Sequence, residues 1–436
     1  MDRLSALDAS FLSVEGATTP MHVGWVAEFE GSAPFDELFA HIAGRLSHAP
    51  RFRQKLAGVP FGVHDPVWVD DTEFDVAHHL LHAEGDLGTI VDAVLSTPLE
   101  RDRPLWEITI VPGERVVLVG KMHHCMVDGT AVVQLGNLLL DAAPEGADTE
   151  PSPWAPRPAP SARSRFVRGA LDRMGDAAAL ALEPARALGA PHRLPGTVAR
   201  AARTGARMVL PPAHASPLNR PGSARRHHVR VTRSLRELRA LRKRFRVTPN
   251  DVLLAACAGA LRRYLDPQVP LKAMVPADVR AHGDSAAGNR ISFVFVELPT
   301  DEPDPLRRVR AVHNATSARE ADGAADTLDA AFRTLALTPG PVQHVLAHAF
   351  AHPRLFNLTV SSVPGPAVPR HLRGLRLDAV HSSVPLAGRH ALSIGVVTVA
   401  GNACLGITAD PDTLPDADEL AVHLDAAFDE LLAAGD

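Results

Sequence analysis

The sequence predicts an α/β protein built from two parts of similar kind. Three observations lead to this prediction. The 436 residues exceed the length of most single domains. Apolar runs of strand character alternate with segments of helical spacing both early and late in the chain. Between them, residues 143–225 are rich in proline and arginine, so we expect an N-terminal subdomain over 1–142 and a C-terminal subdomain over 226–436.

The N-terminal part combines both periodicities. The spacing predicts helices over 35–46, 87–95 and 129–140, a loop or short helix over 6–20, and strands over 21–29, 52–56, 66–69, 106–111 and 115–122. The run from Val116 to Val119 is apolar on both faces, which is typical of a strand in the centre of a sheet.

The middle segment begins with a proline-rich linker over 151–161 and continues into Ala/Leu-rich helical stretches with many arginines. Two interpretations remain open for 160–225. The first is a solvated crossover between the two parts. The second is a basic amphipathic surface that rests peripherally on an anionic membrane or lipid body.

The C-terminal part repeats the alternation. Helices are predicted over 234–245, 249–264, 305–319, 327–337, 342–350 and 414–432, and strands over 271–276, 291–298, 357–360, 391–399 and 404–409. Thr248-Pro249-Asn250-Asp251 has the composition of a helix start. Residues 361–366 are predicted to form a loop after a short strand.

Composition excludes several classes of protein. A net charge of −5 and a single tyrosine argue against nucleic-acid binding. The three cysteines lie far apart and form no C-x-x-C pair, which is typical of a reducing compartment. No signal peptide and no apolar run long enough to span a bilayer are recognised, so a cytoplasmic location is expected, with any membrane or lipid-body contact peripheral.

The chemistry is expected at Lys121–Thr130, where two histidines and an acid follow a buried strand. A metal site is disfavoured, because His123 and His124 are neighbours that an extended backbone would point to opposite faces. A serine triad is disfavoured because no Gly-x-Ser-x-Gly occurs. Cys125 is interpreted as small core filler.

The run His123-His124-Cys125-Met126-Val127-Asp128-Gly129 matches the HHxxxDG motif of the CoA-dependent acyltransferase superfamily, which includes chloramphenicol acetyltransferase and condensation domains. Further segments in the order of the family narrow the match. They are Leu4–Leu12, Thr19–Gly24, Arg103–Glu107, Asn250–Val252, Ala273–Pro276, Gly288–Arg290 and Val363–Pro366. Nearly the whole chain, apart from 143–225, therefore resembles the bacterial wax ester synthase/diacylglycerol acyltransferase family.

The resemblance implies two chloramphenicol-acetyltransferase-like subdomains, each a mixed sheet covered by helices, with an active-site tunnel between them. It implies transfer of a fatty acyl group from acyl-CoA, as co-substrate, to a long-chain alcohol or diacylglycerol, without metal or cofactor. A natural-product or surface-lipid hydroxyl or amine acceptor, or an inactive lipid-binding homologue, remain as alternatives.

The resemblance also implies roles for particular residues. His124 is the general base, while His123, Asp128 and Gly129 support the turn. Arg280 is the candidate partner of Asp128, with Arg290 second. The remaining candidates for the substrate site are Asn289 (an oxyanion donor or a loop asparagine), Arg290, Pro104 and Trp106 (the acyl path or a buried anchor), and Asn250 and Asp251 (the site or a helix start).

Overall fold

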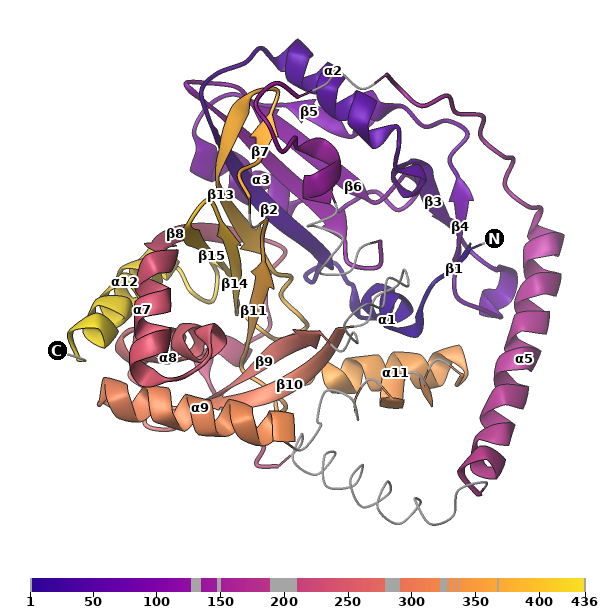
Figure 1. The fold of residues 1–436 in the computed structure, drawn as a ribbon. Helices are drawn as coiled ribbons and strands as arrows, with labels where there is room; N and C mark the ends of the chain where they lie inside the picture. The colour runs from indigo at the N-terminus through magenta and orange to yellow at the C-terminus, as the bar shows by residue number, and fades with distance from the viewer. Residues whose placement is uncertain are drawn as a thin grey trace.

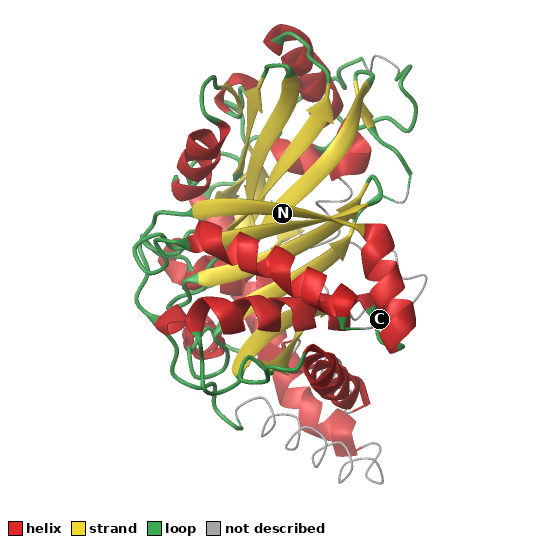
Figure 2. Ribbon diagram, turned by 90° about the vertical axis from the view of Figure 1, so that its left-hand side faces the viewer, coloured by secondary structure: helices red, strands yellow, loops and turns green. Residues whose placement is uncertain are grey.

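The computed structural model describes residues 2–126, 135–146, 150–188, 210–278, 291–321, 328, 330–332, 334–335, 337–366 and 368–434. Two six-stranded mixed sheets run side by side through the middle of the molecule, and helices lie around them (Figure 1, Figure 2). The predicted α/β class, with a mixed sheet in each part, is confirmed.

The first 188 residues contain the N-terminal elements and one long helix. They are β1 (Asp2–Arg3), α1 (Ala6–Val14), β2 (His22–Glu30), α2 (Phe35–Leu46), β3 (Gln54–Ala57), the 3₁₀ turn η2 (Pro60–Gly62), β4 (Val67–Asp70), β5 (Leu80–His82), α3 (Leu87–Ser96), β6 (Trp106–Val111), β7 (Arg115–His123) and α5 (Ala162–Leu188). Of the predicted helix over 129–140, residues 135–139 are helical and 129–134 lie outside the described residues.

The C-terminal elements follow from residue 227. They are β8 (His227–Ser234), α7 (Leu235–Phe245), α8 (Pro249–Leu265), β9 (Leu271–Asp278), β10 (Ile291–Leu298), α9 (Pro305–Ala321), α11 (Gly340–Phe350), β11 (Leu358–Pro364), β12 (His371–Leu372), β13 (Leu375–Ser383), β14 (Leu392–Val399), β15 (Asn402–Ala409) and α12 (Ala417–Ala433).

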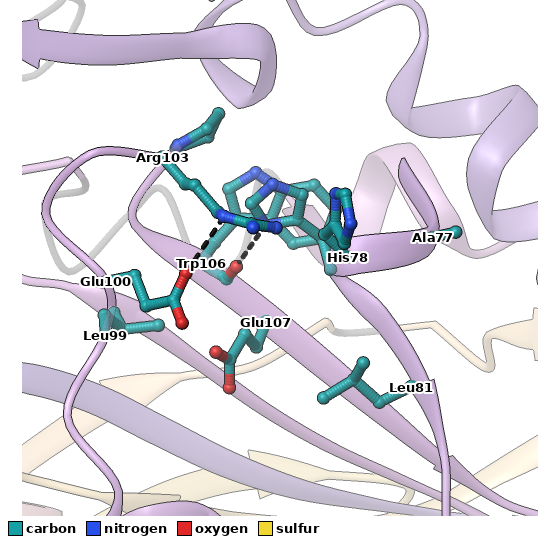
Figure 3. A pocket seen from close by; sticks show the side chains of 10 residues that line it. Ala77, His78, Leu81, Leu99, Glu100, Arg103, Trp106 and Glu107 are labelled. Carbon is teal, nitrogen blue, oxygen red and sulfur yellow. Dashed lines mark hydrogen bonds and ion pairs between the residues drawn. The ribbon is translucent and has the colours of Figure 1, made fainter. Parts of the chain in front are cut away.

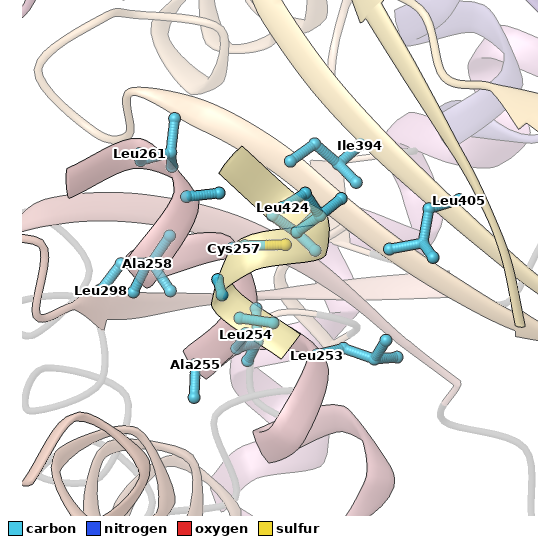
Figure 4. Close-up of a cluster of buried hydrophobic side chains, with 14 of the residues drawn as sticks. Leu253, Leu254, Ala255, Cys257, Ala258, Leu261, Leu298, Ile394, Leu405 and Leu424 are labelled. Carbon is cyan, nitrogen blue, oxygen red and sulfur yellow. The ribbon is translucent and has the colours of Figure 1, made fainter. Parts of the chain in front are cut away.

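One sheet has the order β10-β9-β11-β14-β15-β8, and its core forms around α8. This helix is apolar all round from Val252 to Leu261, so it is buried among α12, α9, α7 and β10 rather than at the surface. Figure 4 shows Leu254, Cys257 and Leu261 of α8 among Leu424 of α12 and side chains of β10, β14 and β15.

The other sheet has the order β12-β13-β2-β7-β6-β5, so strands from residues 371–383 complete a sheet that is otherwise built from the first 123 residues. β13 pairs antiparallel with β2, and its Ser382 packs against Gly395 of β14 and Gly406 of β15. A Cβ at either glycine would overlap Ser382, so glycine allows the two sheets to meet closely here.

Two sequence predictions need correction. The loop predicted at 361–366 is wrong, because β11 continues to Pro364 and Thr359–Pro364 pair in parallel with Ser393–Thr398 of β14. The ladder with β14 provides hydrogen-bond partners for the backbone N–H and C=O groups around Ser361 and Ser362. In addition, β8 and β13 were not predicted.

Gly120 lies near the end of the central strand β7, at a position with no room for a side chain. A Cβ at this position would overlap the ring of Trp25 on β2. We expect Gly120→Ala to lower the free energy of unfolding by about 1–3 kcal/mol, because the packed core cannot expand. Denaturant titration measures this change. Gly58→Ala, at a position with nothing within 4 Å of the added carbon, is the control, and equal losses in both variants would contradict the expectation.

Candidate active site

The predicted histidine turn lies at the C-terminal end of β7, between β2 and β6. His123 is the last residue of the strand and pairs with His22 of β2, while its backbone N–H donates to the Leu105 carbonyl at 2.9 Å. The His124 N–H donates to the Met21 carbonyl at 2.8 Å. The turn is therefore anchored on both sides by the segments that precede β2 and β6.

The two histidine rings have different surroundings. His123 is 1% exposed, its Nδ1 accepts from the Cys125 N–H at 3.0 Å, and its Nε2 lies 3.3 Å from Glu15 Oε1. Since Nδ1 is an acceptor, the proton of neutral His123 belongs on Nε2, which lies beside Glu15 but is not aligned for a hydrogen bond to it. The Nδ1 bond and the neighbouring carboxylate thus hold His123 within the fold.

His124 is only partly buried, and its ring stacks on Phe11 of α1, with ring centroids 3.8 Å apart and planes inclined by 15°. The stack fixes the plane of the imidazole against an apolar wall. A histidine whose ring is held in one orientation is suited to move a proton to or from a bound substrate.

Glu15, which follows α1, connects these features. Its side chain accepts from the Met21 N–H at 3.1 Å, pairs with Arg101, and faces His123. Burial alone would raise the pKa of Glu15, but His123, the Met21 N–H and Arg101 outweigh it and hold the pKa at about 2. Helix α1 therefore supplies both the wall behind His124 and the ionised partner of His123.

Neither Phe11 nor Glu15 was singled out for the site from the sequence. Both lie more than 100 residues before the histidines, and their types alone carry no chemical signal. The end of α1 brings them together, because the backbone N–H of the C-cap residue Glu15 donates to the Phe11 carbonyl at 3.2 Å.

Cys125 is 4% exposed within the N-terminal core, and burial raises the pKa of its thiol well above its usual range. A thiol held in its neutral form is a poor nucleophile, so this cysteine is core filler, as predicted from the sequence.

Pro104 and Trp106 are buried beside the turn and line a pocket of about 350 Å³ near β5 and β6 (Figure 3). Trp106 donates from Nε1 to the Phe52 carbonyl at 2.8 Å and stacks on His79. The side chain thus anchors β6 in the core, one of its two sequence interpretations. A role in the acyl path stays a prediction.

Asp251 is completely buried at the start of α8, far from the surface. It forms a capping box with Thr248, and its carboxylate accepts from Thr316 Oγ1 at 2.6 Å and lies 2.9 Å from His313 Nδ1. The helix-start interpretation of Asn250-Asp251 therefore describes the structure, and Asp251 joins α8 to α9. A contact with substrate stays a prediction for Asn250, which is half-buried in the first turn.

Asp251→Ala is expected to lower the free energy of unfolding by about 1–3 kcal/mol, because the cap and two bonds to α9 are lost together. Thermal and denaturant unfolding measure the loss. The exposed Asp301→Ala, just after β10, is the control. A variant that unfolds like the wild type but loses activity would instead place Asp251 in the substrate site.

Five further predicted residues lie outside the described residues. They are Asp128, Gly129, Arg280, Asn289 and Arg290. The structure therefore tests neither the Asp128–Arg280 pair nor the oxyanion donor.

The two six-stranded sheets and the turn with two adjacent histidines define an acyltransferase of the class that carries the HHxxxDG motif. Comparison with known proteins identifies the family. Residues 4–253 match the wax ester synthase/diacylglycerol acyltransferase catalytic domain, and residues 287–432 match the WS/DGAT C-terminal domain. The chain belongs to the wax ester synthase/diacylglycerol acyltransferase family.

Relatives match along the full length. A Mycobacterium tuberculosis protein named "putative diacylglycerol O-acyltransferase" is 32% identical over 100% of this chain and 91% of its own. The wax ester synthase/diacylglycerol acyltransferase from Marinobacter aquaeolei VT8 has a TM-score of 0.71 at 24% identity, with 100% of both chains covered. The first condensation domain of the CDA synthetase has a TM-score of 0.62 at 14% identity, covering 100% of this chain and 96% of that one. The last two show the fold.

Proposed function

We propose that this protein transfers a fatty acyl group from acyl-CoA to the hydroxyl of a long-chain alcohol or diacylglycerol, with His124 as the general base. The observation that carries the proposal is the fixed difference between the two histidines. His123 is tied to Glu15 and Cys125, whereas His124 is stacked on Phe11 and partly exposed. We therefore assign the structural role to His123 and the proton transfer to His124.

In the proposed reaction, a ring nitrogen of His124 takes the hydroxyl proton as the oxygen attacks the thioester carbonyl. The tetrahedral intermediate then breaks its C–S bond, and the CoA thiolate leaves and takes the proton back from His124. The ester and free CoA are the products. No acyl-enzyme is required, so holding both substrates together supplies much of the rate.

The other residues support these steps in the proposal. Asp128 and Gly129 shape the turn, with Arg280 or Arg290 as the partner of Asp128, and Asn289 donates to the oxyanion. Pro104 and Trp106 border the acyl path, and an apolar cavity between the two sheets holds the chain. Acyl-CoA is a co-substrate, and no metal or cofactor takes part.

The acceptors are lipids, so we also propose that the enzyme works at the inner membrane or a lipid body, in peripheral contact through 160–225. No helix in the described ranges is long and apolar enough to cross a bilayer.

Release of CoA from long-chain acyl-CoA, measured with a panel of acceptors, tests the proposal. Turnover that depends on hexadecanol or diacylglycerol is the expected result. Turnover with only polar alcohols or amines would replace the acceptor class. Lipid binding without any thioester turnover, across donors of different length, would refute catalysis and leave a binding protein.

A further inference from the structure

The long helix α5 lies at the edge of the molecule, away from both six-stranded sheets (Figure 1). Apolar side chains gather around it. Nine of the thirteen large hydrophobic side chains that are exposed in the described part belong to α5, η2 or α11. They are Phe61, Phe166, Val167, Leu171, Met174, Leu182, Val342, Val345 and Leu346. Such a concentration on one region, rather than single scattered residues, calls for a partner.

Five of the exposed residues of α5 form an apolar stripe, hereafter the α5 stripe: Val167, Leu171, Met174, Ala178 and Ala181. Steps of four, three, four and three residues keep them on one side of a helix. Leu171 is 61% exposed and Met174 is 68% exposed, and Leu182 extends the stripe at 53%. Packing within the described part of the protein therefore does not account for apolar residues here.

The opposite side of α5 binds the body of the protein. A Cβ at Gly169 would lie 2.9 Å from Val59 Cγ1, so the helix approaches the η2 region closely there. Arg165 and Arg173 donate to the carbonyls of Gly58 and Val63, and Asp176 pairs with Arg3 at 2.8 Å. The helix is therefore held in one orientation, with the α5 stripe directed outward.

The charged residues of α5 also differ between the side that faces the protein body and the side that carries the α5 stripe. Asp172 and Asp176 face Arg3 on the body side, 4.0 Å and 2.8 Å from its guanidinium. Arg163 and Arg168, at the start of the stripe, are exposed. The outward side at this end thus carries cations beside apolar residues, which complements an anionic lipid headgroup layer above hydrocarbon.

Phe61 adds an aromatic side chain at the same end. It is 95% exposed at the tip of η2, and its ring meets Phe166 of α5 edge to face, with centroids 5.9 Å apart. Its backbone φ of 58° holds it in a left-handed conformation that leaves the ring in solvent. Aromatic side chains next to basic ones are typical of a segment that binds at a membrane interface.

We propose that the α5 stripe and Phe61 dock on an anionic phospholipid surface. Arg173 of α5 donates to the Thr338 carbonyl just before α11, and α11 packs on α1, the helix that carries Phe11 and Glu15. Docking here would connect the lipid surface to the active site through α5, α11 and α1. This step rests on the proposed function, since it takes the acceptor to be a lipid.

Sedimentation of the full-length protein with vesicles tests the docking. We compare phosphatidylcholine vesicles with and without phosphatidylglycerol. The wild type is expected to bind the anionic vesicles, and Leu171→Gln/Met174→Gln to partition about tenfold less. Arg163→Gln/Arg168→Gln should reduce only the dependence on phosphatidylglycerol. Val422→Gln, which changes an equally exposed valine (67%) on α12, is the matched control and should bind as the wild type does.

A second readout separates docking from catalysis. Leu171→Gln/Met174→Gln should keep wild-type turnover with diacylglycerol dispersed in a neutral detergent and lose turnover only with diacylglycerol in anionic vesicles. Equal vesicle binding by the wild type and Leu171→Gln/Met174→Gln would overturn the docking proposal while leaving the proposed acyl-transfer reaction intact. The docking proposal would also be overturned if the wild type were a dimer that does not bind vesicles and Leu171→Gln/Met174→Gln were a monomer. That result would assign the α5 stripe to contact with a second copy of this chain. No turnover with any acceptor would instead refute the proposed function.

Discussion

His124→Ala is expected to lower the turnover number about 10²- to 10⁴-fold, the usual contribution of a positioned general base. The folded structure should survive, because His124 is only partly buried and its backbone bond to Met21 does not depend on the ring. Release of CoA with a saturating acceptor measures the rate, and a thermal melt verifies folding.

The exposed His48→Ala, in the same subdomain, is the control for loss of a histidine as such. Full activity in His124→Ala would remove the general base from the mechanism. The pH profile provides a second check: because the base acts when neutral, the rate should decline as acidification protonates it. A flat profile from mildly acidic to neutral pH would argue against this role.

Glu15→Ala is expected to cost about 3 kcal/mol of folding free energy and to reduce activity as well. The substitution leaves buried His123 without its neighbouring carboxylate and the Met21 N–H without its acceptor, and removes the partner of Arg101. The His124 ring then loses the fixed turn that positions it. Chemical denaturation and CoA release measure the two effects.

The pH dependence of stability gives this variant a specific signature. The pKa of Glu15 falls from 4.5 to about 2 on folding, so its stabilising effect is complete above pH 4.5 and disappears as the pH falls toward 2. Glu15→Ala should therefore lose more stability at pH 7 than at pH 2. Glu100→Ala, a surface glutamate paired with Arg103, is the control, for which less than about 1 kcal/mol is expected. The same loss at both pH values would show that the Glu15 charge is unimportant.

Local signals in the sequence predicted most of the elements. Helix α2 and strand β10 begin and end at the predicted residues, because both have an uninterrupted apolar period. β8 was missed because Arg230 and Arg233 interrupt its apolar pattern at the edge of a sheet. β13 was missed although it alternates, since a strand of mixed composition is recognised only with its partner β2.

The site shows the same limit. The histidine turn was visible because its chemistry is concentrated in seven consecutive residues. The Phe11 stack and the Glu15 contact depend on how α1 packs against the end of β7, and no pattern within a single sequence specifies which distant residues meet. The family resemblance named the chemistry, while the fold supplied the residues that orient it.

The position of β13 has a consequence for synthesis on the ribosome. One edge of β2 has no partner until residues 375–383 have been made, near the end of the 436-residue chain. The catalytic sheet therefore remains open during most of translation, with an unpaired edge available to other chains. A nascent chain halted before β13 should depend on chaperones and be sensitive to proteases, even though every residue of the histidine motif has already emerged.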